Sequence, residues 1–214
     1  MTISVPSSTN SSRPRRYGAI YADPPWHFRN WSAKGTGRNA VSHYDCMSFA
    51  DLASLPVSGL AADDCVLFLW ATDPLLPRAF DLITAWGFEY KTVGFYWVKQ
   101  NVSAKSGDDY FTGLGYWTRA NPEQCLLATR GKPSRRAKDV RRLIVDRRRE
   151  HSRKPDQVRE RIERLVPGPY LELFARETKS GWDCWGNQLS LFDCGSAETR
   201  RQPSRLVGQP APFV

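Results

Sequence analysis

An α/β fold, with a mostly parallel sheet and helices on both of its faces, is the architecture that this sequence predicts. Two runs, "YGAIYAD" at 17–23 and "DCVLFLWAT" at 64–72, are apolar enough to form strands buried on both faces. Patterns of helical period alternate with such runs along the chain, as in βαβ units. With 214 residues, 41% of them hydrophobic, the chain can bury one substantial core.

Two helices are predicted in the first half of the chain. A short one begins after Ser48, a suitable N-cap, because apolar residues recur there at three-residue spacing. A longer one is predicted over 73–87, with Asp73 as N-cap, Pro74 as the first helical residue and Gly87 as the stop. The apolar face of this longer helix comprises Leu75, Leu76, Ala79, Ile83 and Trp86.

The second half predicts further strands and one clear αβ unit. Residues 88–99 and 123–131 are rich in strand-forming residues, and a polar, glycine-containing loop joins them. A short apolar strand is predicted within 139–150. The amphipathic pattern over 155–168 predicts a helix, and the apolar run 169–176 follows it as a buried strand. A helix, a tight turn and a strand in this order are typical of a parallel sheet.

The predicted domain organisation is a flexible leader (1–16), one folded domain (17–190) and a flexible tail (191–214). The leader is polar and lacks an apolar segment of signal-peptide length. The longest apolar run, 65–71, is far shorter than a membrane-spanning helix. We therefore expect no membrane partner.

The cysteines predict free thiols rather than a metal site. The chain has five of them and three histidines, with no C-x-x-C pair, whereas zinc sites need ligands clustered at short spacings. Scattered cysteines fit a reducing compartment, so a cytoplasmic location without a bound metal is expected.

Positive charge is concentrated in one segment. Residues 130–164 hold fifteen Lys or Arg and six Asp or Glu, and this excess equals the net charge of +9 of the whole chain. A charge run is often only a solvated face. A single basic segment on a neutral body also fits a surface that binds the phosphates of a nucleic acid.

The tetrapeptide Asp23-Pro24-Pro25-Trp26 follows the first predicted strand, at the end where α/β sheets bind ligands. A carboxylate and a backbone carbonyl can accept the two N–H bonds of an aryl amine and stabilise the positive charge that develops as the amine attacks. The tryptophan can pack against a base that has left its stack. The chemistry that this suggests is methylation of the N6 amine of adenine.

Several motifs, in this order, resemble the MT-A family of S-adenosylmethionine-dependent adenine-N6 methyltransferases, in its bacterial or phage branch. They are "ADPPW", "HYDCMS", "LFLWAT", "WGFEYKTVGFYWVK", "GLGYWTRANPEQCLLATRG", "HSRKPD", "RIERLVPGPYLELFAR" and "WGNQ". The resemblance covers roughly 19–188. It implies a Rossmann-like methyltransferase fold with a permuted motif order, in which the catalytic motif comes first and the cofactor strand late.

The resemblance also implies site residues, and S-adenosylmethionine as the cofactor. The catalytic loop would be Asp23, Pro24, Pro25 and Trp26, with Asp23 contacting the cofactor as well. Around the adenine it implies Tyr44, Trp97 and Glu123. At the cofactor it implies Lys154, Arg176, Asn187 and Gln188. Arg147, Arg148 and Arg149, within the basic segment, are the residues that we expect to contact the nucleic-acid backbone.

Alternatives to each assignment remain open from the sequence. Tyr44 and Trp97 could be ordinary core aromatics, and Lys154 could be a surface cation. Asn187 could simply end a segment of the chain. The whole protein could be a noncatalytic nucleic-acid-binding subunit on the same fold, although it keeps the Asp-Pro-Pro signature. It could also methylate another amine or amide. DNA is favoured over RNA as the polymer, and a homodimer stays open beside a monomer.

Overall fold

A computed structural model describes residues 15–26, 46–105, 107, 109–149, 153–187 and 189. The predictions for Tyr44, for Gln188, for most of the leader and for the tail lie outside these residues. In the described part of the chain, no helix combines the length and apolar character that crossing a bilayer requires.

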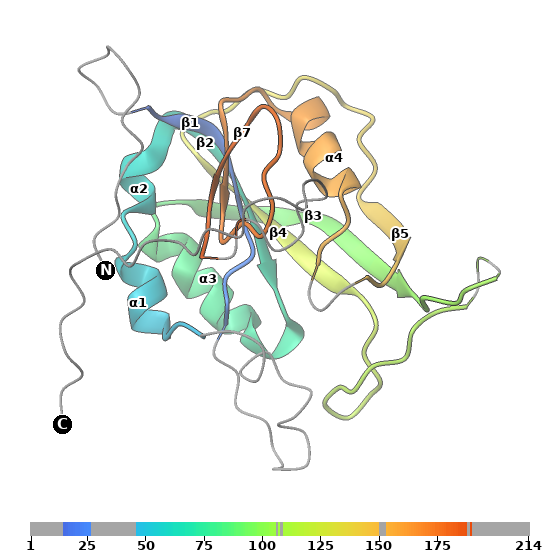
Figure 1. Cartoon of the computed structure of the whole chain (residues 1–214). Coiled ribbons are helices and arrows are strands. Elements are labelled where there is room, and N and C mark those ends of the chain that lie inside the picture. Colours follow the sequence, from blue (N-terminus) through green and yellow to red (C-terminus); the bar gives the residue numbers. More distant parts are fainter. Residues whose placement is uncertain are drawn as a thin grey trace, which may run out of the picture.

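One seven-stranded sheet, flanked by helices, forms the described structure (Figure 1). The elements in chain order are β1 (Tyr17–Ala22), α1 (Phe49–Ser54), α2 (Val57–Leu60), β2 (Ala61–Ala71), the 3₁₀ turn η3 (Asp73–Leu75), α3 (Leu76–Ala85), β3 (Glu89–Gln100), β4 (Glu123–Arg130), β5 (Leu143–Arg147), α4 (Gln157–Leu165), β6 (Tyr170–Leu173) and β7 (Trp182–Trp185).

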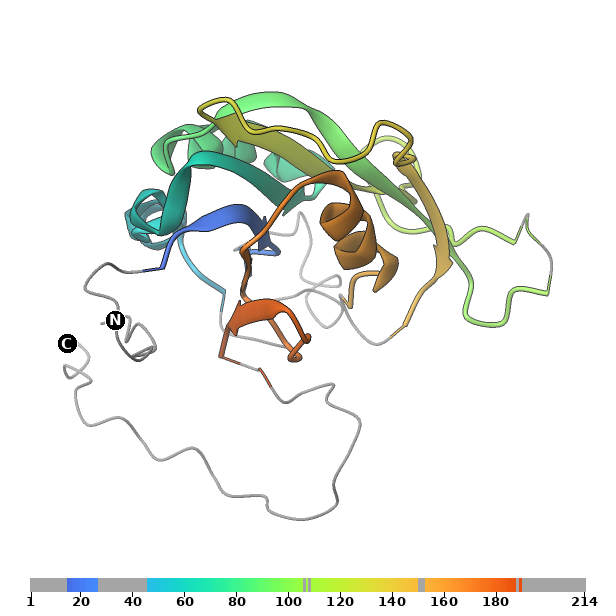
Figure 2. The same ribbon diagram turned by 90° about the horizontal axis from the view of Figure 1, so that it is seen from above.

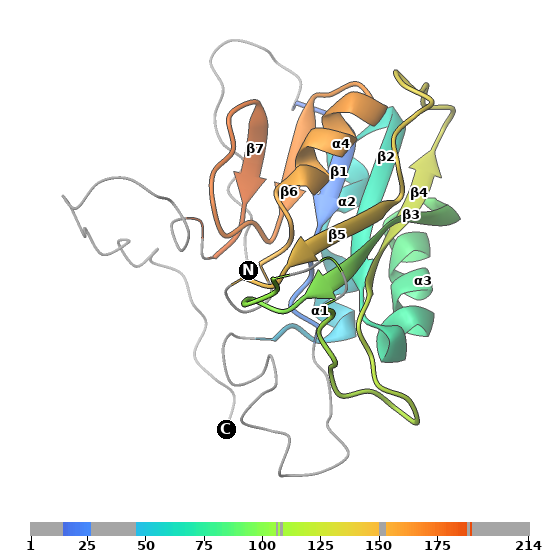
Figure 3. The same ribbon diagram turned by 90° about the vertical axis from the view of Figure 1, so that its right-hand side faces the viewer.

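The sheet is mostly parallel, as predicted. Its strand order is β5-β3-β4-β2-β1-β6-β7, and β4 is antiparallel to both of its neighbours. The other pairs are parallel, including β1 with β2 and β1 with β6. Figure 3 shows the arrow of β4 opposed to those of β1, β3 and β5. Because β4 runs backwards, its first residue lies at the edge where the parallel strands end.

Helices cover both faces, which confirms the predicted layers. On one face, α1, α2 and α3 pack through Leu52, Val57 and Leu82 on strand residues such as Leu67. On the other face, α4 packs through residues that include Val158 on the alternate strand residues. Figure 2 shows the sheet strongly curved, with α4 inside the curve. Successive strand residues therefore serve two separate cores, as the period of two requires.

The predicted start of the long helix is wrong. Asp73 and Pro74 belong to the 3₁₀ turn η3, and α3 begins at Leu76, two residues later than predicted, with Leu75 at its N-cap position. The stop is confirmed, since Gly87 has a φ of +80° directly after the helix. Ser48 is confirmed as a cap, because its side chain accepts a hydrogen bond from the backbone N–H of Asp51.

The last strand, β7, was not predicted. It pairs in parallel with β6 and extends the sheet beyond the expected final strand. The preceding αβ unit is confirmed, although α4 ends at Leu165 and the extended residue Val166 follows it, before Gly168 is reached.

Candidate active site

Four segments that are distant in sequence meet at one edge of the sheet. Ala22 of β1 pairs with Leu173 of β6, so the residues that follow both strands lie side by side. Ala71, at the end of β2, pairs with Gln124, and this pairing places Glu123 at the same edge. The segment before α4 supplies the fourth contribution. The sequence predicted this position for the segment after β1, and the antiparallel β4 adds the third segment.

The Asp-Pro-Pro-Trp turn is fixed mainly by its backbone. The Trp26 N–H donates to the carbonyl of Pro24 (2.8 Å), and the Met47 N–H donates to the carbonyl of Pro25 (3.0 Å). The Trp26 indole N–H donates to the carbonyl of Trp70 on β2 (3.1 Å). Each proline carbonyl keeps a second lone pair, so Pro24 can still accept from a ligand. The turn is therefore rigid before any substrate binds.

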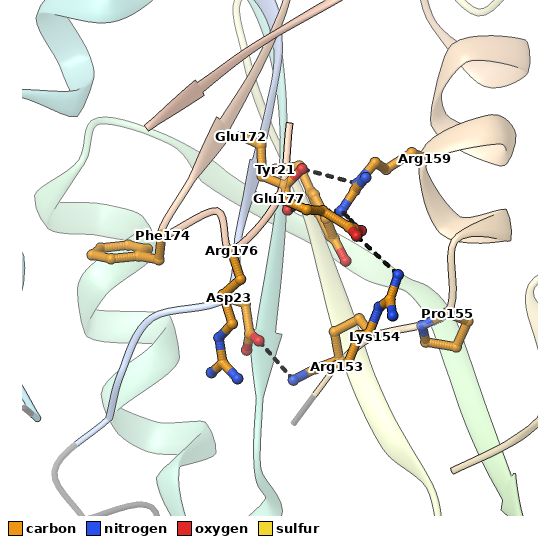
Figure 4. A pocket seen from close by; sticks show the side chains of 10 residues that line it. All are labelled: Tyr21, Asp23, Arg153, Lys154, Pro155, Arg159, Glu172, Phe174, Arg176 and Glu177. Atoms are coloured by element: carbon orange, nitrogen blue, oxygen red, sulfur yellow. Dashed lines mark hydrogen bonds and ion pairs between the residues drawn. The ribbon is translucent and has the colours of Figure 1, made fainter. Parts of the chain in front are cut away.

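Asp23 lies in a pocket that is lined mostly by charged residues (Figure 4). The lining consists of Tyr21, Asp23, Arg153, Lys154, Pro155, Arg159, Glu172, Phe174, Arg176 and Glu177. Figure 4 shows Asp23 and Arg176 next to each other, with the Glu172–Arg159 pair deeper between β6 and α4. Two predicted cofactor residues, Lys154 and Arg176, are thus brought to the predicted catalytic carboxylate.

Lys154 connects two carboxylates from different strands. Its Nζ lies 2.8 Å from Oδ2 of Asp23 and 3.4 Å from Oε2 of Glu123, and its side chain is 11% exposed. Glu123 also contacts Lys99 at 2.5 Å. Burial opposes the charge of Lys154, but Asp23 and Glu123 outweigh it and hold the pKa of Lys154 above its usual value. The interpretation of Lys154 as a surface cation is therefore wrong.

The same network keeps Glu123 ionised. Burial alone would raise its pKa, but the neighbouring Lys154 and Lys99 lower the pKa of Glu123 to about 2. Asp23, Lys154, Glu123 and Lys99 thus form a chain of alternating charges that we call the edge network. Such a chain holds each carboxylate in one place before a ligand arrives.

Glu172 is a second, deeper acidic group that sequence reasoning missed. It is 7% exposed, and its Oε2 lies 2.9 Å from Nε of Arg159. This ion pair is its charged contact, and the buried oxygen has no hydrogen-bond partner in the described part of the chain. Burial, opposed by Arg159 but aided by Glu177 and Asp23, raises the pKa of Glu172 to about 7. A carboxylate within the apolar strand "YLELF" was the sequence signal for it.

Asn187 follows β7 and lies near Arg176 through the backbone. The Ala175 N–H donates to the carbonyl of Trp185 (3.0 Å), so the chains after β6 and β7 run together. A Cβ at Gly186 would come within 2.2 Å of the Ala175 oxygen, so only glycine fits there. Asn187 itself is exposed and does not line the pocket.

Phe174 lines the pocket in a strained backbone conformation. Its φ is +63°, which is uncommon for a residue with a side chain, and its ring packs edge-on against Trp185. Strain of this kind gathers at ligand sites, where the surrounding structure holds it in place.

Trp97 lies in the core, on the same face of the sheet as α4. It is 4% exposed, and its indole N–H donates to the carbonyl of Asp146 (3.1 Å). Its ring makes a cation–π contact with the ammonium of Lys99, whose Nζ lies 5.2 Å from the ring centroid. The structure favours the interpretation as a core aromatic over direct contact with an adenine.

The basic segment divides between the two edges of the sheet. Arg130 is the last residue of β4, at the end far from Glu123, so the segment begins at the edge opposite the pocket. Arg147 pairs with Gln100 at the end of β3 and lies at the pocket edge. Residues 131–147 thus carry the basic segment from one edge of the sheet to the other, and Arg147, Arg148 and Arg149, which we expect to contact the nucleic-acid backbone, lie at its pocket end.

The three arginines at the pocket edge also have structural contacts. Arg147 donates to the carbonyl of Ala104, and the guanidinium of Arg148 lies 3.6 Å from the Phe111 ring centroid. Arg149 donates to Asp156 and to the backbone carbonyl of Lys154. Arg149 therefore positions the lysine of the edge network. Among the described residues, no three His, Cys, Asp or Glu side chains gather as a metal site would require.

Comparison with known proteins gives this site a family. The family model described as MT-A70 matches residues 17–188, which span nearly all of the described structure. The chain belongs to the MT-A70 family. The resemblance read from the motifs is thus confirmed.

Named relatives fall into two groups. A type II methyltransferase, M.MunI, from a Mycoplasma species is 34% identical over 193 residues, which cover 82% of this chain and 78% of that protein. A putative N(6)-adenosine-methyltransferase from Medicago truncatula is 34% identical over 82% of this chain but only 27% of its own length. The human N(6)-adenosine-methyltransferase catalytic subunit METTL3 is 29% identical over 91% of this chain and 33% of its own length. This MT-A70 chain thus spans about a third or less of those eukaryotic relatives.

Proposed function

We propose that this protein transfers a methyl group from S-adenosylmethionine to the N6 amine of adenine in DNA. The observation that carries the proposal is the meeting of Asp23, Lys154 and Arg176 in one pocket at the edge of the sheet, in an MT-A70 chain. DNA is favoured over RNA because the match to the type II methyltransferase covers most of both chains. Type II methyltransferases modify DNA as a class.

The pocket residues fit this cofactor chemically. Glu172 lines the pocket beside Arg159, and its carboxylate can accept a hydrogen bond from a donor such as a ribose hydroxyl. Arg176 and Lys154 can bind the carboxylate of the methionine part, and Asp23 can face its positive charges. When bound, S-adenosylmethionine supplies an electrophilic methyl group on a sulfonium.

The chain's own residues orient the amine. Oδ2 of Asp23 is held by Lys154 at 2.8 Å, and a carboxylate has a second oxygen that can accept one N–H of the amine. The carbonyl of Pro24 can accept the other, since only one of its lone pairs is used by Trp26. Two fixed acceptors favour the pyramidal nitrogen that attacks, and they stabilise the positive charge that develops on it.

A labelling experiment tests the proposal. Purified protein is incubated with methyl-labelled S-adenosylmethionine and, separately, double-stranded DNA, single-stranded DNA and RNA, and the nucleosides are then resolved. We expect label on N6 of adenine in DNA and none with Asp23→Ala. Label on another base would support a different amine specificity, and label only in RNA would reverse the choice of polymer. Absence of both label and cofactor binding would favour the noncatalytic binding subunit.

The pKa of Glu172 predicts how cofactor affinity depends on pH. The pKa of its carboxyl group is raised to about 7, so below that pH the group is mostly protonated in the free protein. An ionised carboxylate is the better acceptor for a cofactor hydroxyl. Binding is therefore coupled to loss of this proton, and affinity should rise with pH.

We expect the Kd for S-adenosylhomocysteine to fall roughly tenfold between pH 6 and pH 8. The ligand also titrates, so Glu172→Gln is measured in parallel by calorimetry, and only the difference between the two proteins is interpreted. Identical pH profiles for the wild type and Glu172→Gln would show that Glu172 does not bind the cofactor.

A further inference from the structure

The chain between β3 and β4 extends away from the sheet (Figure 1) and forms a hairpin over residues 113–120 with large, exposed apolar side chains. The Gly113 N–H donates to the carbonyl of Ala120 (2.8 Å), and the two residues form an antiparallel bridge that closes the hairpin. At the tip, Leu114 is 69% exposed and Trp117 is fully exposed. Tryptophan is usually largely buried, so such a position needs an explanation.

The base of this hairpin is fixed to the active site. The Asn121 side chain accepts from the N–H of Lys99 (2.8 Å) and donates to the carbonyls of Lys99 and Phe111 (2.9 and 2.5 Å). The guanidinium of Arg148 packs over the Phe111 ring. Lys99 belongs to the edge network, through its contact with Glu123. The hairpin therefore starts from a braced base beside the reactive groups.

The tip conformation presents Trp117 outward. Trp117 has a φ of +65°, a conformation that residues with side chains rarely adopt. A Cβ at Gly115 would lie 2.4 Å from the Thr118 carbonyl oxygen, so the tight turn requires glycine there. Backbone strain in an exposed tip does not improve the packing of the core. Because such strain gathers at ligand sites, it points to a role in binding.

We propose that Trp117, together with Leu114 on the same tip, inserts into the base stack of double-stranded DNA and fills the space vacated by the target adenine. The inference rests on the proposed function, which requires an adenine to leave the duplex and enter the pocket. Unstacking a base costs free energy, and inserted apolar side chains offset that cost in proteins that deform DNA.

Charge on the hairpin and at its base supports DNA as the occupant. Arg119 is exposed near the tip, and Arg147, also exposed, lies at the same edge of the sheet. Cations near an apolar wedge and at its base can contact the phosphates that flank a base step. If the tip bound another protein instead, its loss would affect activity on paired and unpaired DNA equally. The following experiment uses this difference.

The test compares Trp117→Ala with the wild-type protein on three DNA substrates. They are a duplex that the wild type methylates, its adenine strand alone, and the same duplex with an abasic site opposite the target adenine. We expect kcat/KM to fall at least tenfold on the duplex and to change less than twofold on the other two, because there the adenine is already unpaired. Trp117→Phe should keep most of the duplex activity. Phe80→Ala, which removes a half-exposed aromatic from α3, serves as the control and should leave all three substrates unaffected.

In the activity assay, the inference would be overturned by an equal loss on all three substrates or by no loss on the duplex. An equal loss together with a changed mass in light scattering would assign Trp117 to a protein interface instead.

A fluorescence titration tests insertion independently of methylation, so failure of the inference can be distinguished from failure of the proposed function. Insertion should quench tryptophan emission when duplex is added to the wild type, and much less in Trp117→Phe, whether or not the duplex is methylated. Equal quenching in the two proteins would also contradict insertion.

Discussion

Replacing Asp23 by asparagine is expected to lower the single-turnover rate of methyl transfer by roughly 10²–10³-fold, the usual effect of removing one preorganised electrostatic contact at a reacting atom. The substitution keeps the shape of the side chain but removes its charge and turns one acceptor oxygen into a donor NH₂. That donor would face the N–H bonds of the amine. Lys154 would keep Glu123 as a partner at 3.4 Å, so the fold should survive.

The measurement uses saturating labelled cofactor and excess enzyme, so that binding does not limit the rate. Asp139→Asn is the matched control, because Asp139 also contacts a cation, Arg164, but is exposed and lies outside the pocket. It should leave the rate unchanged. If Asp23→Asn kept more than a tenth of the wild-type rate, Asp23 could not be the group that holds the amine.

The layers of the fold were predictable because buried positions are occupied mainly by apolar residues, and their spacing along the chain differs between strands and helices. Strands β1 and β2 lie inside the sheet with both faces covered, so nearly every position is apolar. The amphipathic pattern of α4 likewise follows from one face packed on the sheet. Such averaged patterns survive a few exceptions, and they placed Asp23 directly after a buried strand, at the end where α/β sheets bind ligands.

The start of α3 and the existence of β7 depend on finer balances. An aspartate followed by a proline suits either an α-helical N-terminus or a 3₁₀ turn, and the two differ only in which hydrogen bonds close. Strand β7 is four residues long, and only one of them, Trp182, is buried. A short edge strand with little burial has no clear sequence pattern.

The site shows the same division. Asp23 and Lys154 could be identified because a sequence motif contains each of them, and their contact follows from where those motifs lie in the fold. The division of the basic segment between the two edges of the sheet could not be identified, because it depends on the path of residues 131–147 from the end of β4 to the end of β5. Composition reports the amount of charge in a segment but not its position in space.

Replacing Lys154 by glutamine should remove cofactor binding and also destabilise the folded protein. The substitution leaves the Asp23 and Glu123 carboxylates close together, without the ammonium that contacts both of them. Removing one member of a largely buried ion pair typically costs about 3 kcal/mol or more in the free energy of unfolding. Lys91→Gln is the matched control: Lys91 contacts Glu89 at 2.6 Å, but both are exposed, so a loss below about 1 kcal/mol is expected.

The pH dependence of this loss identifies its cause. The pKa of Glu123 is lowered from 4.5 to about 2, so its contribution to stability is complete above pH 4.5 and disappears as the pH falls through about 2. The pKa of Lys154 is raised, so its contribution persists until the pH rises beyond its ordinary value. The difference in unfolding free energy between the wild type and Lys154→Gln should therefore be largest near pH 7 and shrink steadily below pH 4.5. Denaturant titrations at pH 7, 4 and 3 measure it, and a difference that does not change with pH would mean that Lys154 stabilises the fold by packing rather than by its charge.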